Sequence, residues 1–173
     1  MGKNIVLTGF MMAGKTSIAT ELSKITARKL FDSDQVIVDE AGMSINRIFE
    51  KFGEGYFRDL ETEVIKKLSE LEDAIISTGG GVVLREENIA ELRKNGVIVN
   101  INITPEVIKN RLMSSKGSRP LIKDSGFDDV LARLDARREF YKNCDFMVDA
   151  RNDSTPKEQA ELILKILKRN GEI

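Results

Sequence analysis

The stretch Gly9–Thr16, GFMMAGKT, decides the fold, and it matches the pattern G-x-x-x-x-G-K-[ST]. It follows the apolar run Asn4–Thr8, which predicts a strand, and apolar residues at helical spacing predict a helix over Lys15–Arg28. A loop that leads from a strand into a helix N-terminus directs backbone N–H groups and a partial positive charge at a bound phosphate. The complete motif in this context favours a nucleoside triphosphate site over the alternative, a glycine-containing turn with an exposed lysine.

The composition is typical of one globular domain and excludes several kinds of chemistry. The chain has 173 residues, 41% of them hydrophobic and 32% charged, so we expect a single domain over residues 1–173. It contains no histidine, which excludes imidazole catalysis, and its one cysteine, Cys144, excludes an internal disulfide. The net charge of −1 gives no reason to expect nucleic acid or membrane partners, and no leader or membrane-spanning run is found. We expect a cytoplasmic monomer.

Predicted strands and helices alternate along the chain. The strands are expected at residues 4–8, 29–32, 74–78, 97–103 and 145–150. The helices are expected at 15–28, 44–53, 57–71, 86–94, from 105, over 127–142 and from 156. In the fourth strand, alternate residues from Val97 to Ile103 are expected to point inward. The alternation predicts an α/β fold, a single three-layer αβα domain with a five-stranded parallel sheet covered on both faces.

Other classes of P-loop protein need further motifs that this chain lacks. A GTPase would need a guanine-reading N/T-K-x-D segment, and none occurs. The segment Asp39–Gly42, DEAG, matches a switch pattern but does not follow a strand, so we interpret it as coincidental. An ATP-driven motor usually has an acidic residue at the end of a buried strand, whereas AIIST ends in Ser77 and Thr78. The switch and motor interpretations are therefore weak.

Asp32 and Asp34 follow the second predicted strand. In an extended chain, residues i and i+2 face the same way, and ligands bind at the carboxyl ends of strands in open α/β sheets. With Thr16, Asp32 could help to hold hydrated Mg²⁺, while Asp34 could accept a hydrogen bond from an acceptor hydroxyl. The alternative is a simple helix N-terminus, where aspartate is common.

Two further segments carry candidate binding groups. Arg58 follows the apolar Phe57, but Glu61 lies three residues further on, so a surface ion pair is slightly favoured from the residues alone. The run Gly79–Gly81 after a predicted buried strand would leave amides open to an anion, or it could form a plain flexible turn.

Basic residues near the C-terminal third raise similar alternatives. Lys116 and Arg119 lie in the predicted loop 114–126, either on a flap that brings positive charge over a phosphate and excludes water or on a solvated basic loop. The side chains of Arg137 and Arg138 point about 100° apart on a helix, so only one of them is expected to serve a pocket.

In combination, these segments resemble the shikimate kinases, small P-loop enzymes of the nucleoside monophosphate kinase-like fold. The resemblance covers the whole chain and is carried, in family order, by GFMMAGKT, FDSD, GMSINRIFEKFGEGYFRDLE, STGGGVV, SRPLI and the Arg-x-x-x-Tyr of Arg137–Tyr141. It implies transfer of the γ-phosphate of ATP to the 3-hydroxyl of shikimate, in the route to chorismate and the aromatic amino acids. It also implies Mg²⁺ and a lid over about 112–125.

The resemblance implies a role for each matching residue. The catalytic residues would be Lys15, Asp34 and Arg119. The nucleotide would be bound by Gly9, Met12, Ala13, Gly14, Lys15, Thr16, Ser17, Arg111, Arg119 and Pro156, and Mg²⁺ by Thr16 and, through water, Asp32. Shikimate would be bound by Asp34, Arg58, Gly79, Gly80, Gly81 and Arg137. This reverses the preference for a surface role at Arg58, and the spacing to Tyr141 selects Arg137 over Arg138. Direct in-line transfer without a phosphoenzyme is expected.

The chain departs from the family pattern at two places. Met12 stands where a third glycine is usual, so the loop dihedral angles could shift. The segment between Arg111 and Arg119 is one residue longer than usual, which puts the adenine role of Arg111 in doubt. Two rival functions remain, a kinase with another small acceptor such as gluconate and a non-catalytic ATP-binding regulator. The intact motif residues Lys15, Thr16, Asp34, Arg58 and Arg119 argue against the regulator.

Overall fold

The computed structural model describes residues 2–114 and 126–173, around a five-stranded parallel sheet of order β2-β3-β1-β4-β5. β1 (Asn4–Gly9) is central and pairs with β3 (Ile75–Ser77) and β4 (Gly96–Asn102). β2 (Leu30–Asp32) and β5 (Phe146–Asp149) are the edge strands. Because all the strands are parallel, their carboxyl ends meet at one edge, where ligands bind in such sheets. The predicted fold class and strand number are confirmed.

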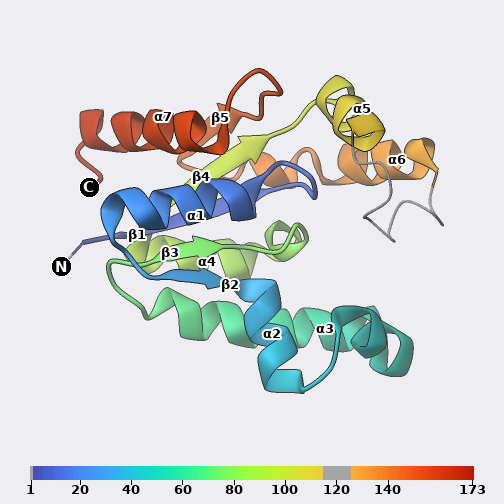
Figure 1. The fold of residues 1–173 in the computed structure, drawn as a ribbon. Helices are drawn as coiled ribbons and strands as arrows, with labels where there is room; N and C mark the ends of the chain where they lie inside the picture. Colours follow the sequence, from blue (N-terminus) through green and yellow to red (C-terminus); the bar gives the residue numbers. More distant parts are fainter. Residues whose placement is uncertain (1, 115–125) are drawn as a thin grey trace.

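Helices cover both faces of the sheet (Figure 1). α1 (Lys15–Thr26) and α7 (Pro156–Arg169) pack against each other, as do α3 (Ile45–Ser69) and α4 (Glu86–Asn95). Since neither face is open to water, β4 is buried along almost its whole length, including Asn100. The expected inward alternation of β4 was therefore wrong, because strands of a doubly covered parallel sheet bury both faces.

A helix that the sequence did not predict, α2 (Ser33–Ala41), follows β2 directly. Asp32 is its N-cap: Oδ1 accepts hydrogen bonds from the N–H groups of Asp34 (3.0 Å) and Gln35 (3.3 Å). Asp34 thus lies in the first turn of a helix, and the argument from an extended chain was wrong. The alternative of a helix N-terminus is the local structure found, since the Asp32 carboxylate satisfies N–H groups that have no partner within the helix.

α3 contains the interruption that Gly53 predicts. Gly53 has φ 85° and ψ 174°, which is not helical, so two helical segments meet there at a kink. The expected N-cap is also present, because Ser44 Oγ accepts from the N–H of Arg47 at 3.3 Å. The second segment carries Phe57, Arg58 and Glu61 towards the sheet edge that holds the phosphate loop.

The C-terminal part differs from prediction mainly in where helices end. The remaining elements are the 3₁₀ turn η1 (Val82–Leu84), α5 (Pro105–Ser114), α6 (Phe127–Arg137) and the 3₁₀ turn η3 (Phe140–Lys142). The helix predicted to reach residue 142 therefore ends at Arg137. α7 begins with a capping box between Thr155 and Glu158. Within the described residues, no helix has the length and apolar character needed to cross a membrane.

Candidate active site

The phosphate loop, Gly9–Thr16, joins the central strand β1 to α1 at the carboxyl edge of the sheet. Gly9 has φ 144°, and a Cβ there would lie 2.6 Å from the carbonyl oxygen of Ile101, so only glycine fits. The N-cap of α1, Gly14, has no side chain to accept from the N–H groups of the first turn. Those N–H groups, with the positive end of the helix dipole, form the anion site that the motif predicts.

Lys15 lies folded over the phosphate loop. Its Nζ donates to the carbonyl oxygens of Gly9 at 2.6 Å and Phe10 at 2.9 Å. Desolvation lowers the pKa of Lys15 to about 8, against the opposing attraction of the Asp34 and Asp32 carboxylates. The ammonium group is thus held at the place where phosphate charge would arrive.

Met12 adopts the backbone conformation that glycine would take. Its φ is 68°, in the left-handed region, which costs a non-glycine residue roughly 1–2 kcal/mol. The Met12 carbonyl accepts a hydrogen bond from Arg111 Nη1, so α5 holds the loop at this point. Although Met12 replaces the glycine that is usual in the family, the loop therefore keeps a left-handed backbone conformation at this residue.

Thr16 and Asp32 form a pair of oxygen donors beside the loop. Thr16 Oγ1 donates to Asp32 Oδ2 at 3.4 Å, while Asp32 Oδ1 caps α2. Hydroxyl and carboxylate oxygens suit Mg²⁺, which keeps several waters and binds through few protein ligands. The Thr16 hydroxyl and the Asp32 carboxylate therefore fit a hydrated ion bound with phosphate. Within residues 2–114 and 126–173, no group of three or more acidic or cysteine side chains could hold a metal ion.

Asp34 projects from α2 against the glycine run after β3. Ser33 Oγ accepts from the N–H of Gly79 at 2.9 Å, and a Cβ at Gly79 would collide with the Asp34 carboxylate. Desolvation is the main cause that raises the pKa of Asp34, and the Asp32 charge adds to it, whereas Lys15 lowers it. Ser33 was not singled out from the sequence, because a serine after a strand carries no signal of such a contact.

Arg58 and Glu61 form a buried ion pair on α3. Arg58 Nη1 lies 2.7 Å from Glu61 Oε1, with side chains only 11% and 1% exposed. The expectation of a surface pair was therefore wrong about exposure, although the i,i+3 spacing did predict the contact. Arg58 Nε has no partner among the described residues. A Cβ at Gly81 would collide with the guanidinium, so the third glycine gives the arginine its space.

Arg137 and Tyr141 complete this side of the site. The Tyr141 hydroxyl donates to the carbonyl of Gly80 at 2.6 Å, and burial raises its pKa to about 12 despite a hydrogen bond with Arg137. A Cβ at Gly80 would lie 3.7 Å from Arg137 Nη1. Arg138 points elsewhere and pairs with Asp135 at 2.8 Å. We call Asp34, Arg58, Glu61, Arg137 and Tyr141 the acceptor cluster.

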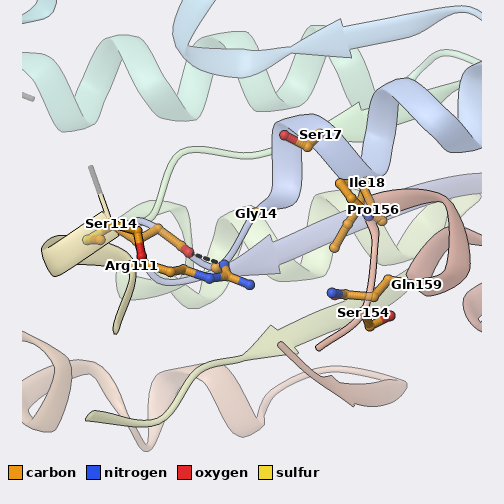
Figure 2. A pocket seen from close by; sticks show the side chains of 10 residues that line it. Gly14, Ser17, Ile18, Arg111, Ser114, Ser154, Pro156 and Gln159 are labelled. Carbon is orange, nitrogen blue, oxygen red and sulfur yellow. Dashed lines mark hydrogen bonds between the residues drawn. The ribbon is translucent and has the colours of Figure 1, made fainter. Parts of the chain in front are cut away.

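Two cavities lie along the phosphate loop. The first, the base cavity, is about 380 Å³ and is lined by Met12, Ala13, Gly14, Ser17, Ile18, Arg111, Ser114, Ser154, Pro156 and Gln159 (Figure 2). The second is about 240 Å³ and is lined by Met11, Met12, Gly14, Lys15, Thr16, Ser17, Asp32, Asp34, Thr78, Gly79 and Gly80. The cavities share Met12, Gly14 and Ser17, so a nucleotide could place its base in the first and its phosphates near Asp34 in the second.

Arg111 forms one wall of the base cavity. Besides its bond to Met12, it donates through Nε to Asn152 Oδ1 and through Nη2 to the carbonyl of Arg151, each at 3.1 Å. Arg119 and Lys116 lie outside the described residues, as does the predicted lid from residue 115 on. Residues 112–114 belong to α5, so the chain is still helical where the lid was expected to begin.

Comparisons with known proteins agree on one family. The family model described as shikimate kinase matches residues 11–168. The chain is 45% identical to the shikimate kinase of Caldicellulosiruptor bescii over 95% of each chain, and 42% identical to that of Thermodesulfovibrio yellowstonii over 96% of each.

Solved structures lead to the same assignment. A shikimate kinase from Acinetobacter baumannii in complex with shikimate has a TM-score of 0.88 at 29% identity, covering 98% of this chain and 95% of that one. The shikimate kinase of Aquifex aeolicus has a TM-score of 0.81 at 37% identity, covering 97% and 98%. With the phosphate loop and its two cavities, these likenesses establish that the chain belongs to the shikimate kinase family.

Proposed function

We propose that this chain transfers the γ-phosphate of ATP to the 3-hydroxyl of shikimate, giving shikimate 3-phosphate and ADP on the route to chorismate. The observation that carries the proposal is a cavity that Lys15 and Asp34 both line together with Gly79 and Gly80, and Gly80 lies close to Arg137 of the acceptor cluster. Phosphoryl transfer depends mainly on positioning and charge stabilisation, so these residues suffice for direct in-line transfer without a phosphoenzyme.

Asp34 is the proposed base for the reacting hydroxyl. Its half-buried carboxylate faces the phosphate loop, and its raised pKa brings it closer to the range in which a base works at neutral pH. The contact with Gly79 restricts where the carboxylate can lie. Asp34 would therefore both orient the hydroxyl and accept its proton.

The two arginines of the acceptor cluster are proposed to bind the shikimate carboxylate and ring hydroxyls. A guanidinium matches a planar carboxylate with two parallel hydrogen bonds. Glu61 pairs with Nη1 of Arg58, and the exposed Glu54 pairs with Nη2 at 3.4 Å, a contact that a substrate carboxylate would replace. Gly80 lies near Arg137 and Gly81 lies against Arg58. These contacts would hold the 3-hydroxyl towards Asp34.

Lys15 and Arg119 are proposed to stabilise charge on the transferred phosphate. Lys15 lies in the phosphate loop, and the assignment of Arg119 rests on the resemblance of SRPLI alone. Mg²⁺, held by Thr16 and through water by Asp32, would supply positive charge at the phosphate oxygens. We further infer a monomeric enzyme of the cytoplasm that acts on small molecules, without nucleic acid or membrane partners; sedimentation of the purified chain tests the oligomeric state.

The first experiment is an ADP-release assay with MgATP and shikimate, gluconate or AMP as acceptor. We expect turnover with shikimate, and an Asp34→Asn variant should lose roughly 10²–10⁴-fold in kcat, the range for a lost general base. Turnover with gluconate or AMP but not with shikimate would contradict the assignment of shikimate as the acceptor. ATP binding without turnover on any of the three acceptors would contradict the proposal that the chain catalyses phosphoryl transfer.

A further inference from the structure

Arg85 joins the segment after the glycine run to the turn of α3 that carries Arg58. It stands between η1 and α4, shortly after Gly81, and its side chain caps no N–H group of α4. Instead, Nη1 donates to the main-chain carbonyl of Arg58 and to Thr62 Oγ1, each at 3.2 Å, and Nη2 donates to Asp59 Oδ1 at 2.8 Å. One guanidinium therefore binds main chain and side chains within a single turn of α3.

This turn of α3 is not held in place by the helix that precedes it. The helix is interrupted at Gly53, whose φ of 85° and ψ of 174° are not helical. The direction of the segment that follows therefore depends on its contacts with other elements. Arg85 supplies such a contact at a partly buried place, since its side chain is 31% exposed and Thr62 is 5% exposed. A hydrogen bond from a cation is stronger there than in open water.

The segment that carries Arg85 also borders the Arg58 side chain. A Cβ at Gly81 would collide with the Arg58 guanidinium, so main chain and guanidinium lie in close contact. The path from Gly81 to Arg85 is short, and the buried Asn88 holds it, because Asn88 Nδ2 donates to the carbonyl of Val82 at 3.0 Å. Arg85 thus fixes the main chain of Arg58 relative to the glycine run that its guanidinium touches.

We propose that Arg85 is a positioning residue for the shikimate carboxylate and that it acts by holding Arg58 in place to pair with that group. Arg85 lines neither of the two cavities along the phosphate loop, which indicates an effect through Arg58 rather than contact with substrate. Glu61 binds the guanidinium of Arg58, whereas Arg85 binds its main chain. The inference rests on the proposed binding of shikimate by Arg58 and adds a residue that the sequence motifs did not single out.

Direct binding of shikimate and of its methyl ester tests this role without relying on turnover. The ester keeps the ring hydroxyls but has no charged carboxylate. Calorimetry measures both dissociation constants for the unchanged chain, Arg85→Met, Arg85→Lys and the control Arg93→Met, and denaturant unfolding measures the stability of each protein. Arg93 is a matched control, because it also ties α4 to another segment, donating to Asp145 Oδ1 and Asn143 Oδ1, each at 3.1 Å.

We expect the unchanged chain to bind shikimate about 50-fold more tightly than the ester, within the range for one hydrogen bond to a charged group. Arg85→Met should reduce this preference about fivefold by weakening shikimate, as expected for partial loss of that bond. Arg85→Lys should recover part of the loss, because one ammonium group can still donate to the Arg58 carbonyl. Arg93→Met should keep the full preference.

Equal weakening of shikimate and ester by Arg85→Met would overturn the proposal and indicate a role in packing alone. The same loss of preference in Arg93→Met, or a preference below twofold in the unchanged chain, would also overturn it. Thr62→Val removes one acceptor of Arg85 from the α3 side and serves if Arg85→Met does not fold; an unchanged preference in that variant counts against the proposal. Shikimate binding without turnover would contradict the proposed function while these binding ratios still test Arg85.

Discussion

The phosphate loop and the acceptor cluster meet at Asp34, which lines the cavity along the loop, but they are built from different groups. The loop supplies main-chain N–H groups from one continuous segment, whose path requires glycine at Gly9. The acceptor cluster supplies side chains from α2, α3, α6 and η3, held by contacts such as the Arg58–Glu61 pair. A site made of one backbone segment is specified locally, whereas a site made of distant side chains depends on the packing of the whole domain. We therefore expect substitutions to affect the two substrates separately.

Within the phosphate loop, the largest effect is expected at Lys15, the one charged side chain that the loop itself contributes. Lys15→Met removes the ammonium from the phosphates, and kcat/KM for ATP should fall about 10³-fold, as for loss of one preorganised electrostatic group. Steady-state kinetics with saturating shikimate measures this. The control is Lys142→Met, since Lys142 is 61% exposed and pairs with Glu139. A loss below tenfold would show that the backbone alone binds the phosphates.

The acceptor cluster is tested at Glu61, which touches Arg58 rather than substrate. Glu61→Gln removes the negative charge of the buried pair, and the KM for shikimate should rise about tenfold while the KM for ATP stays unchanged, because a hydrogen bond to a neutral amide holds the Arg58 guanidinium less firmly than an ion pair does.

Glu54→Gln is the matched control for this change, since Glu54 also pairs with Arg58, at 3.4 Å, but is 63% exposed. Such an exposed pair contributes little, so near-unchanged kinetics are expected. Equal effects of the two substitutions, or a rise in the KM for ATP, would contradict the separation of the two halves.

pH should affect the two halves in opposite directions. Lys15, with a pKa of about 8, is charged below that pH and loses its proton above it. At pH 9, kcat/KM for ATP should be about tenfold lower than at neutral pH, because roughly one lysine in ten keeps its charge. The pKa of Asp34 is raised, so acidification should protonate the proposed base and lower kcat/KM for shikimate. A profile for ATP that stays flat to pH 9 would contradict the role of Lys15.

The smallest effect is expected at Met12. Met12→Gly relieves the left-handed conformation but gives the unfolded chain more freedom, and the two effects nearly cancel, to within about 1 kcal/mol of unfolding free energy. The KM for ATP should change less than about twofold, since only the main chain of Met12 binds Arg111. Denaturant unfolding and ATP titration measure both quantities, with Met12→Ala as the control that keeps the strain. A tenfold change in the KM for ATP would assign the side chain a role.

The sequence predicted the phosphate loop better than the acceptor cluster, because the loop is one continuous segment and the cluster is assembled from distant side chains. Strand, loop and helix around Gly9–Thr16 follow from local pattern, and so do the sheet and most of the helices. α2 was missed because Asp32, its N-cap, was interpreted as part of an extended chain. The burial of Arg58 and Glu61 was missed because an i,i+3 pair looks the same in sequence whether water or another segment covers it.

The two oxygens of Asp32 also limit how this position can evolve. One oxygen starts α2 and the other faces Thr16. Asparagine could still cap the helix but would bring no negative charge, and glutamate would keep the charge on a longer arm that suits the cap less well. No single replacement preserves both contributions. Drift at residue 32 should therefore be rare even in lineages where much of the surrounding surface is free to vary.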